Sequence, residues 1–520
     1  MQFFTKKLGA VPILVLFLTG AGFDVFAQRT ITGTVKDAST GEALFGANVV
    51  VKEDRTKGTV TDLDGHFSIS VGKDARTLVV SYTGFEAVEQ NIEGINDVFI
   101  SLGDSKALKE VLVIGYGTVK REDATGLVQS VNSDQFNKGA IVSPQQLIAG
   151  KIAGVVVTSD GGPGGGSTIR IRGESSLSAS NDPLVVVDGI PLDNPGKDGN
   201  GISGSRNALN SINPNDIESV TVLKDASAAA IYGNRASAGV IIITTKKGKL
   251  GKKISVGYSG NLSFGKTYNR VDALIADEFR DVIKNNLNLA ADPSKQIALL
   301  GNANTDWQDE IYQHSSGFEH NLNLSGGVGQ VPYRVSFGYT NQDGLLRTDN
   351  FNRYSTAANL SPKFLNNRLQ FNLNFRGSKA RNRFADRGAI GNALYIDPTQ
   401  PVRDTSQKYG GFFVWKLNNG NPNTLAPTNP VSLLELKQDK STVDQYNTSG
   451  SIDYRFKHFP ALRANLNLAY DHAHGQGTVV VPNYAAFAFD EIYGGGVNNT
   501  YQQTKTNSLL EAYLNYKKTF

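Results

Sequence analysis

Three short patterns in the sequence contain residue types that bind ions or phosphate in other proteins. Asp62–Gly65 has the carboxylates that begin a calcium loop, but Val71 stands where such a loop needs glutamate, so a hairpin turn is predicted. Gly161–Gly166 lacks the lysine and hydroxyl residue of a phosphate-binding loop, which favours a flexible hinge or a turn. His472 and His474 could ligate zinc, yet a solvated strand end is the favoured interpretation.

The sequence predicts no catalytic site. It contains no Gly-x-Ser-x-Gly elbow, no His-Glu-x-x-His motif and no carboxylate pair spaced for glycoside chemistry. Cysteine is absent from the 520 residues, which excludes disulfides, thiolate catalysis and cysteine-based metal sites. The 52 basic and 48 acidic residues give a formal charge of +4, so no nucleic-acid partner is expected. We therefore expect neither an enzyme nor a resident metal or cofactor.

Residues 1–27 have the organisation of a secretory signal peptide. Two lysines precede an apolar core over Leu8 to Leu18, and cleavage is expected between Ala27 and Gln28. The core is too short for a membrane anchor, and no cysteine follows it for lipid attachment. The chain is therefore expected to be exported.

Residues 28–103 are predicted to fold as a small β-sandwich. Short alternating runs recur at regular spacing and are separated by turn pairs such as Thr40-Gly41. The predicted strands are Thr30–Lys36, Ala47–Lys52, Thr59–Thr61, His66–Val71, Thr77–Tyr82 and Asp97–Leu102.

Residues 122–249 are predicted to form a compact α+β domain. A short helix is expected from Ser143, a good N-cap followed by Pro144, and the pair Asp188-Gly189 predicts a tight turn. A second, Ala-rich helix is expected over Asp225–Tyr232. The predicted strands are Thr168–Gly173, Leu184–Val187, Ile217–Lys224 and Ala238–Lys246, the last with a β-branched centre typical of burial on both faces.

Residues 250–520 alternate apolar and polar side chains over segments long enough to span a membrane at a tilt. In Leu369–Arg376 the odd positions are apolar and are expected to face lipid, while the even positions are polar and face a lumen. Short turns and long loops alternate, as expected for a periplasmic and an extracellular side. The predicted strands are Ile254–Phe264, Glu319–Val328, Tyr333–Asn341, Tyr354–Lys363, Arg368–Ser378, Tyr446–Phe456, Ala461–Tyr470 and Leu509–Tyr516, with one helical insert over Asp272–Asn286.

The amino-acid sequences of two regions resemble those of a known family. The blocks "STIRIRG", "DPLVVVDGIPLD" and "NDIESVTVLKDASAAAIYGNRASAGVIIITTKKGK" resemble the plug domain of TonB-dependent outer-membrane transporters of the SusC/RagA branch. The block "ITGTVKDASTGEALFGANVVVKEDRTKGTVTDLDGHFSISV" resembles the carboxypeptidase-regulatory-like extension of the same proteins. This resemblance implies a mainly β protein in which a plug fills an antiparallel transmembrane barrel.

The number of strands is too small for such a barrel. About eight are predicted, whereas a plugged transporter needs roughly 22. We therefore expect this chain to be the N-terminal part of a larger barrel.

Residues 104–121 are predicted to be a linker that contains an apolar strand. An exposed, unpaired strand can add to the edge of a partner's sheet through main-chain hydrogen bonds, although an ordinary plug strand is the alternative. By resemblance this segment is the TonB box, which comprises Glu110, Val111, Leu112, Val113, Ile114, Gly115, Tyr116 and Gly117.

Arg170 and Arg172 are two apart in a predicted strand and should point to the same face. A surface pair is one interpretation. Because the resemblance places this strand inside a barrel, ion pairs with acidic residues of the barrel wall are the other.

The resemblance implies TonB-dependent import of a large nutrient, an oligosaccharide or an oligopeptide, across the outer membrane. The implied partners are TonB with its energising complex, a SusD-like surface lipoprotein and outer-membrane lipid, with the N-terminal domain and the TonB box in the periplasm. A signal-transducing receptor or a siderophore transporter is the alternative, and a secreted adhesin of β-modules is a third interpretation.

Overall fold

The computed structural model describes residues 29–38, 41–82, 85–103, 111–114, 117–120, 128–159, 161–164, 167–174, 181–192, 202–205, 207–224, 230–249, 253–289 and 292–517. The predicted signal peptide with Ala27 and Gln28 lies outside these residues, as do Glu110, Gly115 and Tyr116 of the predicted TonB box. The chain forms two compact units, Met1–Leu112 with Thr118–Ala124 and Val113–Gly117 with Thr125–Phe520. Within the described ranges, no helix is long and apolar enough to cross a membrane, a finding that concerns helices only.

The N-terminal unit is the predicted β-sandwich. Strands β4-β1-β7 form one sheet and β3-β2-β5-β6 form the other, and buried residues of both sheets share one core. The carboxylate of Asp62 accepts hydrogen bonds from the backbone N–H of Asp64 and of His66, so the predicted turn is present. It is not a hairpin, because β3 and β4 on either side of it belong to different sheets. The strands are β1 (Arg29–Asp37), β2 (Asn48–Val51), β3 (Gly58–Val60), β4 (His66–Val71), β5 (Thr77–Ser81), β6 (Val88–Asn91) and β7 (Asp97–Leu102).

The predicted TonB box contains a paired strand. Strand β8 (Val111–Ile114) pairs with β9 (Gly117–Lys120) in a two-stranded sheet. The expectation of an unpaired strand was therefore wrong, because β9 pairs with β8. A two-stranded sheet still presents a second edge of each strand for further pairing.

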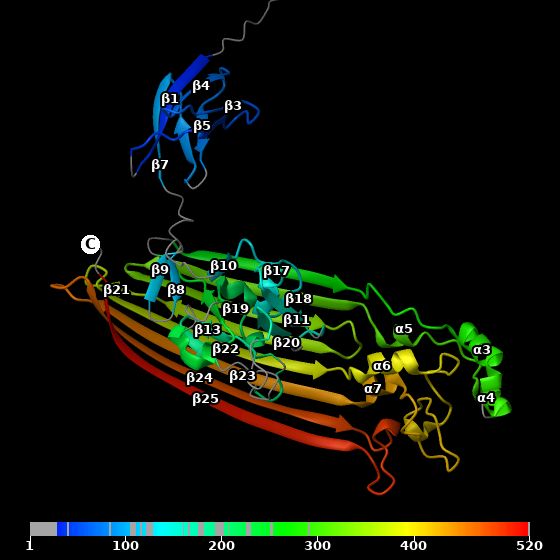
Figure 1. Ribbon diagram of the computed structural model, residues 1–520. Coiled ribbons are helices and arrows are strands. Elements are labelled where there is room, and N and C mark those ends of the chain that lie inside the picture. Colours follow the sequence, from blue (N-terminus) through cyan, green and yellow to red (C-terminus); the bar gives the residue numbers. More distant parts are fainter. Residues whose placement is uncertain are drawn as a thin grey trace, which may run out of the picture. The chain divides into compact units, whose positions relative to one another are not determined.

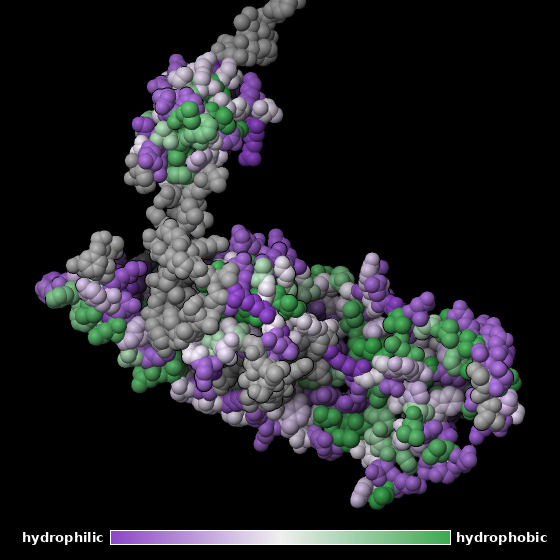
Figure 2. All heavy atoms as spheres, in the orientation of Figure 1, coloured by the Kyte–Doolittle hydropathy of each residue, from purple (hydrophilic) through white to green (hydrophobic). Residues whose placement is uncertain are grey.

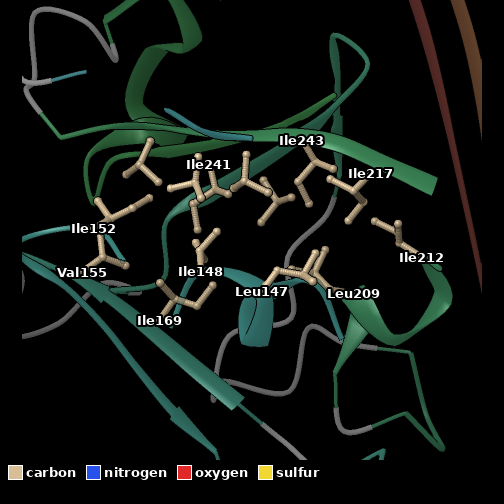
Figure 3. Close-up of a cluster of buried hydrophobic side chains, with 14 of the residues drawn as sticks. Leu147, Ile148, Ile152, Val155, Ile169, Leu209, Ile212, Ile217, Ile241 and Ile243 are labelled. Atoms are coloured by element: carbon tan, nitrogen blue, oxygen red, sulfur yellow. The ribbon is translucent and has the colours of Figure 1, made fainter. Parts of the chain in front are cut away.

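The central domain contains a mixed sheet, in the order β10-β15-β16-β13-β14, and a separate hairpin of β11 and β12. Its core lies between the sheet and helix α1, where Leu147 and Ile148 pack among Ile217, Ile241 and Ile243 (Figure 3). The elements are β10 (Val128–Asn132), α1 (Pro144–Ile148), β11 (Val155–Ser159), β12 (Ser167–Ile171), β13 (Leu184–Val187), β14 (Ile190–Leu192), η2 (Ala208–Ser211), η3 (Pro214–Asp216), β15 (Ile217–Leu223), η4 (Ala230–Ala236) and β16 (Val240–Thr245).

Local sequence explains several boundaries of these elements. Ser143 is the N-cap residue of α1 and Pro144 follows it at the first helical position, as predicted. The side chain of Gln146 accepts a hydrogen bond from the backbone N–H of Ser143 over 3.2 Å. Asp188 and Gly189 have φ values of 50° and 88°, the two positive values of a type I′ turn between β13 and β14. Of the predicted Ala-rich helix only η4 is described.

The third region is one antiparallel sheet, here called the wall sheet, in the order β17-β18-β19-β20-β22-β23-β24-β25, with the short β21 paired to β22 (Figure 1). All eight predicted strands are present, and several extend beyond their predicted ends into the long connections. Among the described strands, β17 and β25 each pair on one side only. The strands are β17 (Ser255–Gly265), β18 (Ser315–Val328), β19 (Val331–Asp343), β20 (Asn350–Leu360), β21 (Lys363–Phe364), β22 (Leu369–Phe384), β23 (Gln438–Arg455), β24 (Leu462–Val481) and β25 (Val497–Tyr516).

The long connections gather at one end of the wall sheet. Helices α5, α6 and α7 share a small core there, and hydrophilic residues cover the α3 and α4 region (Figure 2). The predicted insert over 272–286 is confirmed as α3. The helices are α3 (Ala276–Asn285), η5 (Leu287–Leu289), α4 (Pro293–Leu299), α5 (Trp307–Ile311), α6 (Gly388–Tyr395), η6 (Gln407–Tyr409), α7 (Pro430–Leu436) and η7 (Ala486–Ala488).

Candidate functional site at the contact between central domain and wall sheet

The inward face of the wall sheet is polar and contacts the central domain. The Asn213 side-chain amide caps η3 and donates to Asn321 Oδ1 over 2.7 Å and to Ser355 Oγ over 3.3 Å. Gly338 lies under the same amide, since a Cβ at this position would come within 2.3 Å of Asn213 Nδ2. The neighbouring Asn215 donates to Glu319 Oε1 over 2.6 Å. A single short turn thus contacts three wall strands.

Two ion pairs connect acidic groups of the central domain with arginines of the wall. Arg334 Nη2 lies 2.8 Å from Asp216 Oδ1, with both side chains nearly buried. Arg376 Nη1 lies 2.7 Å from Asp188 Oδ2, and the Asp188 side chain is 3% exposed. Asp188 also accepts hydrogen bonds from the backbone N–H and the hydroxyl of Thr245, so both oxygens of its carboxylate have partners.

Lys246 lies beside the first of these pairs. Its Nζ donates to the carbonyl oxygen of Asn215 over 2.9 Å. Burial lowers the pKa of Lys246, and the nearby Arg334 lowers it further, while Asp216 opposes both effects. The two carboxylates of Asp216 and Glu218 thus favour the charged form of Lys246, against the effects of burial and of Arg334.

Arg353 is a wholly buried guanidinium group, with 0% exposure. Its Nη1 donates to the carbonyl oxygens of Val142, Asn210 and Ile212 over 2.8, 2.8 and 3.1 Å, and its Nη2 donates to Thr340 Oγ1 over 3.3 Å. The first three acceptors belong to two separate segments of the central domain. Arg353 therefore clamps these segments to the wall through main-chain atoms, and we call this arrangement the Arg353 clamp.

A third set of contacts lies near β25. The backbone N–H of Ser203 donates to Gln503 Oε1 over 2.8 Å, and the Gly204 carbonyl accepts from Ser441 and from Asn382. A Cβ on Gly475 would come within 1.9 Å of the Ser203 carbonyl oxygen, so the two backbones need glycine here. These contacts extend the interface across the sheet from β18 to β25.

Apolar burial contributes little to this interface. Among the described residues two small clusters join the wall and the central domain, Val142 with Phe351 and Ala380, and Ile202 with Val443 and Ala473. Polar contacts can be replaced by hydrogen bonds to water when two surfaces separate, whereas a large apolar interface cannot. These polar contacts can hold the central domain against the wall, and water can replace them if the two surfaces separate.

The glycine-rich segment is a tightly packed turn rather than a loose hinge where it is described. A Cβ on Gly162 would come within 2.5 Å of Asp349 Oδ2, and one on Gly164 within 2.4 Å of Phe351 Cδ2. The segment therefore approaches the wall at van der Waals distance, which a residue with a side chain could not do.

We expect Gly164→Ala to destabilise the central domain by about 1–3 kcal/mol more than Gly161→Ala. Both glycines have positive φ, 62° and 84°, so the backbone strain is matched, but a Cβ on Gly161 meets nothing within 4 Å. Proteolysis of the purified protein at increasing urea concentration measures the difference. Equal midpoints for the two variants would show that the contact with Phe351 is unimportant.

The ion pairs of Arg170 lie within the central domain and not, as one of the two interpretations had predicted, with the wall. Arg170 Nη1 pairs with Asp182, and its Nε lies 3.9 Å from Glu174, both in the central domain. Arg172 has a φ of 58° just after the end of β12, so it does not share a strand face with Arg170. In the two ion pairs that do connect the wall with the central domain, the arginine is on the wall and the carboxylate is on the central domain.

The histidines also differ from the expectation. His472 and His474 lie within β24, where each Nδ1 is hydrogen-bonded to a threonine of β25, at 3.1 and 2.8 Å. They are partly exposed and do not form a strand tip. Within the described part of the chain no group of three possible metal ligands occurs.

Sequence reasoning missed Arg334, Arg353, Asp188 and Asp216 as contact residues. One available signal was alternation, which correctly assigned Arg376 to the inward face. The same alternation places arginine at further inward positions, but it does not identify the partner of each.

A globular domain with its own core, held inside a sheet of long antiparallel strands, defines the class of plugged β-barrel proteins. Residues 120–240 match the family model of the TonB-dependent Receptor Plug Domain, and residues 31–113 match the CarboxypepD_reg-like domain. The chain belongs to the TonB-dependent receptors of the SusC type, which are outer-membrane proteins. The central domain is their plug.

Two relatives and one structure show the extent of the similarity. The chain is 44% identical to the TonB-dependent receptor SusC of Bacteroides thetaiotaomicron over 98% of this chain and 51% of that protein. It is 32% identical to a TonB-dependent receptor of Formosa agariphila over 99% of this chain and 49% of that protein. The structure of the RagAB peptide importer has a TM-score of 0.61 at 22% identity over 76% of this chain and 46% of that one, which supports the fold. The chain spans about half the length of the curated relatives it matches.

Proposed function

We propose that the native protein imports a large nutrient, an oligosaccharide or an oligopeptide, across the outer membrane. TonB binds the segment from Glu110 to Gly117 in the periplasm and pulls the plug away from the wall. A SusD-like surface lipoprotein covers the outer face, where substrate first binds. No enzymatic step is assigned.

The observation that carries this proposal is the polar contact between plug and wall. The Arg353 clamp, two ion pairs and the amide contacts of Asn213 hold the plug without a large apolar interface. Such contacts keep the plug seated at rest but can be broken one after another by a directed pull, with water replacing each lost hydrogen bond. The choice of substrate class is supported by the similarity to SusC and to the RagAB peptide importer.

Three predicted features are part of this proposal. The first is the set of domain boundaries: the signal peptide ends at residue 27, the regulatory-like domain at 103, the linker at 121 and the plug at 249, where the barrel begins. The second is cleavage between Ala27 and Gln28, and the third is the periplasmic location of the N-terminal domain. For Arg170 we propose a role within the plug, supported by its ion pair with Asp182.

Uptake by intact cells tests the proposal. Cells that carry the native gene should accumulate labelled oligosaccharides or oligopeptides, and either deletion of the gene or a protonophore should abolish the accumulation. Binding to the cell surface should survive the protonophore, since it does not need TonB. Uptake of a small sugar that diffuses through porins is the control. An adhesin would instead bind its ligand at the surface without any uptake.

A further inference from the structure

The outward face of the wall sheet changes from apolar to polar along each strand from β18 to β25, with the short β21 left aside, whereas the outward residues of β17 remain uncharged and mostly apolar to its end at Gly265. On β22 the outward residues near the short turns are Leu373 and Phe375, whose partners on neighbouring strands are also mainly apolar or uncharged. Toward the long connections the outward positions become Lys379, Arg381 and Arg383. This face points away from the plug, because the alternate residues such as Arg376 contact the plug.

The boundary between the two zones runs diagonally across the sheet. Gly260 of β17 and Thr504 of β25 belong to the same transverse row of paired residues, which also contains His320, Tyr339, Tyr354, Lys379, Asp444 and His474. The last outward apolar residue is Phe264 on β17, four residues beyond Gly260 toward the long connections. On β25 it is Leu510, six residues from Thr504 toward the short turns.

This diagonal has the slope of a membrane surface. A shift of ten residues along the strands corresponds to about 33 Å, and seven strand spacings correspond to about 34 Å. The boundary is therefore inclined by roughly 45° to the transverse row, which matches the usual tilt of strands in outer-membrane barrels. A plane parallel to the membrane fits the boundary, with tyrosines at or near it on four strands: Tyr339, Tyr354, Tyr446 and Tyr470.

Basic side chains gather just beyond this boundary on β22 and β23. Lys379, Arg381 and Arg383 occupy successive outward positions of β22, and Lys440 is paired in register with Arg383. Lys379 lies 3.3 Å from Asp444. Arg381 and Arg383 form no ion pair among the described residues. We call these four basic residues the outward basic patch.

The outward neighbours of the patch are otherwise neutral. Arg381 is paired in register with Asn352 and Thr442, and Arg383 with Asn350. Two carboxylates lie near the four basic groups on this face, Asp444 beside Lys379 and Asp343 in the row of Arg383 beyond Asn350, so the patch keeps an excess of positive charge. Arginine and lysine side chains are long enough to reach along the surface toward the boundary.

We propose that the outward basic patch binds the phosphate groups of lipid headgroups in the outer leaflet of the membrane. The inference rests on the proposed outer-membrane orientation, with the long connections outside. Guanidinium groups bind phosphate oxygens through paired hydrogen bonds, and the patch lies at the depth where headgroups meet the barrel. An acidic surface of a partner protein is the competing occupant.

Lipid binding by the purified native protein in a neutral detergent tests this proposal. The probe is bis-phosphorylated lipid A, compared with dephosphorylated lipid A and with inorganic phosphate. The variant R381Q/R383Q/K440Q removes three charges from exposed or half-exposed side chains. The matched control K266Q/K284Q/K295Q removes three exposed charges from the long segment between β17 and β18, at the same end of the sheet.

We expect the patch variant to bind the phosphorylated lipid on the order of a hundredfold more weakly, since each basic residue near a membrane surface contributes about 1 kcal/mol. The control variant should bind like the wild type, and higher salt should weaken wild-type binding. Equal affinity of both variants would overturn the proposal, as would equal binding of the dephosphorylated lipid. Displacement of the lipid by an equal concentration of inorganic phosphate would point to a free phosphate site and would also overturn it.

Failure of the lipid-binding proposal can be distinguished from failure of the transport proposal. If cells fail to take up any nutrient but the protein binds the phosphorylated lipid through the patch, the function falls and the lipid site stands. If the patch variant loses binding of an acidic partner protein while its lipid affinity is unchanged, the lipid proposal falls and the transport proposal stands.

Discussion

Replacing Val111 and Val113 by proline is expected to abolish energised uptake while leaving substrate binding at the outer face intact. In the proposed mechanism TonB adds a strand to the segment from Glu110 to Gly117 through main-chain hydrogen bonds. Proline has no backbone N–H and fixes φ, so it removes donors from one edge of β8 and prevents regular pairing. Two measurements show the effect. One is nutrient uptake by cells, and the other is binding of the isolated periplasmic domain of TonB to the protein.

The matched control is Val111→Thr with Val113→Thr. Threonine keeps the backbone N–H and favours strands, so transport should remain close to the wild type. Deletion of Glu110 to Gly117 should reproduce the proline result. If the proline variant transports normally, this segment is not the site where TonB pulls; the match of the regulatory-like domain model up to residue 113 would then indicate that β8 belongs to the N-terminal domain.

Arg353→Met is expected to loosen the plug by roughly 3 kcal/mol, because each of three buried acceptors loses its donor and leaving one such group unsatisfied costs about 1–3 kcal/mol. The substitution keeps the length of the side chain but leaves the carbonyl oxygens of Val142, Asn210 and Ile212 without their shared donor in a dry site. Proteolysis of the plug at increasing urea concentration measures the loss. Leakage of large antibiotics into cells without TonB provides a second measurement.

Arg381→Met is the control for this prediction. Arg381 is on the adjacent strand but points to the opposite, exposed face, so the same substitution there should change plug stability by less than about 0.5 kcal/mol. Arg353→Lys should recover only part of the stability, because one ammonium group cannot bind all four acceptors in the geometry of the guanidinium fork. Equal protease resistance of the Arg353 and Arg381 variants would contradict the clamp.

Most of the secondary structure could be predicted from the sequence because it depends on local patterns. The alternation in Leu369–Arg376 predicted which residues of β22 face inward, and the contact of Arg376 with Asp188 confirms it. The pair Asp188-Gly189 predicted a tight turn because few other residues adopt positive φ at both positions. The error at Arg172 has the same local origin, since its positive φ lies just after the end of β12 and the strand alternation no longer applies there.

Partners across the interface could not be predicted in this way. Asp216 and Arg334 are 118 residues apart in the sequence, and Asp188 and Arg376 are 188 residues apart. Their contact depends on the strand registers, the stagger of the sheet and the position of the plug together, and no local pattern encodes these. One interpretation of the sequence therefore placed the plug arginines against acidic wall residues, whereas the structure pairs wall arginines with acidic turns of the plug.

The sequence by itself determined the class of protein, the order of its domains and the two faces of each wall strand, because composition, turn residues and alternation are local properties. Only the tertiary structure decided which groups hold the plug. Arg353 shows the difference most clearly: its acceptors are main-chain carbonyl oxygens, which every residue possesses, so no side-chain pattern could indicate them. The outward basic patch likewise emerges only when the strand registers place Arg383 beside Lys440.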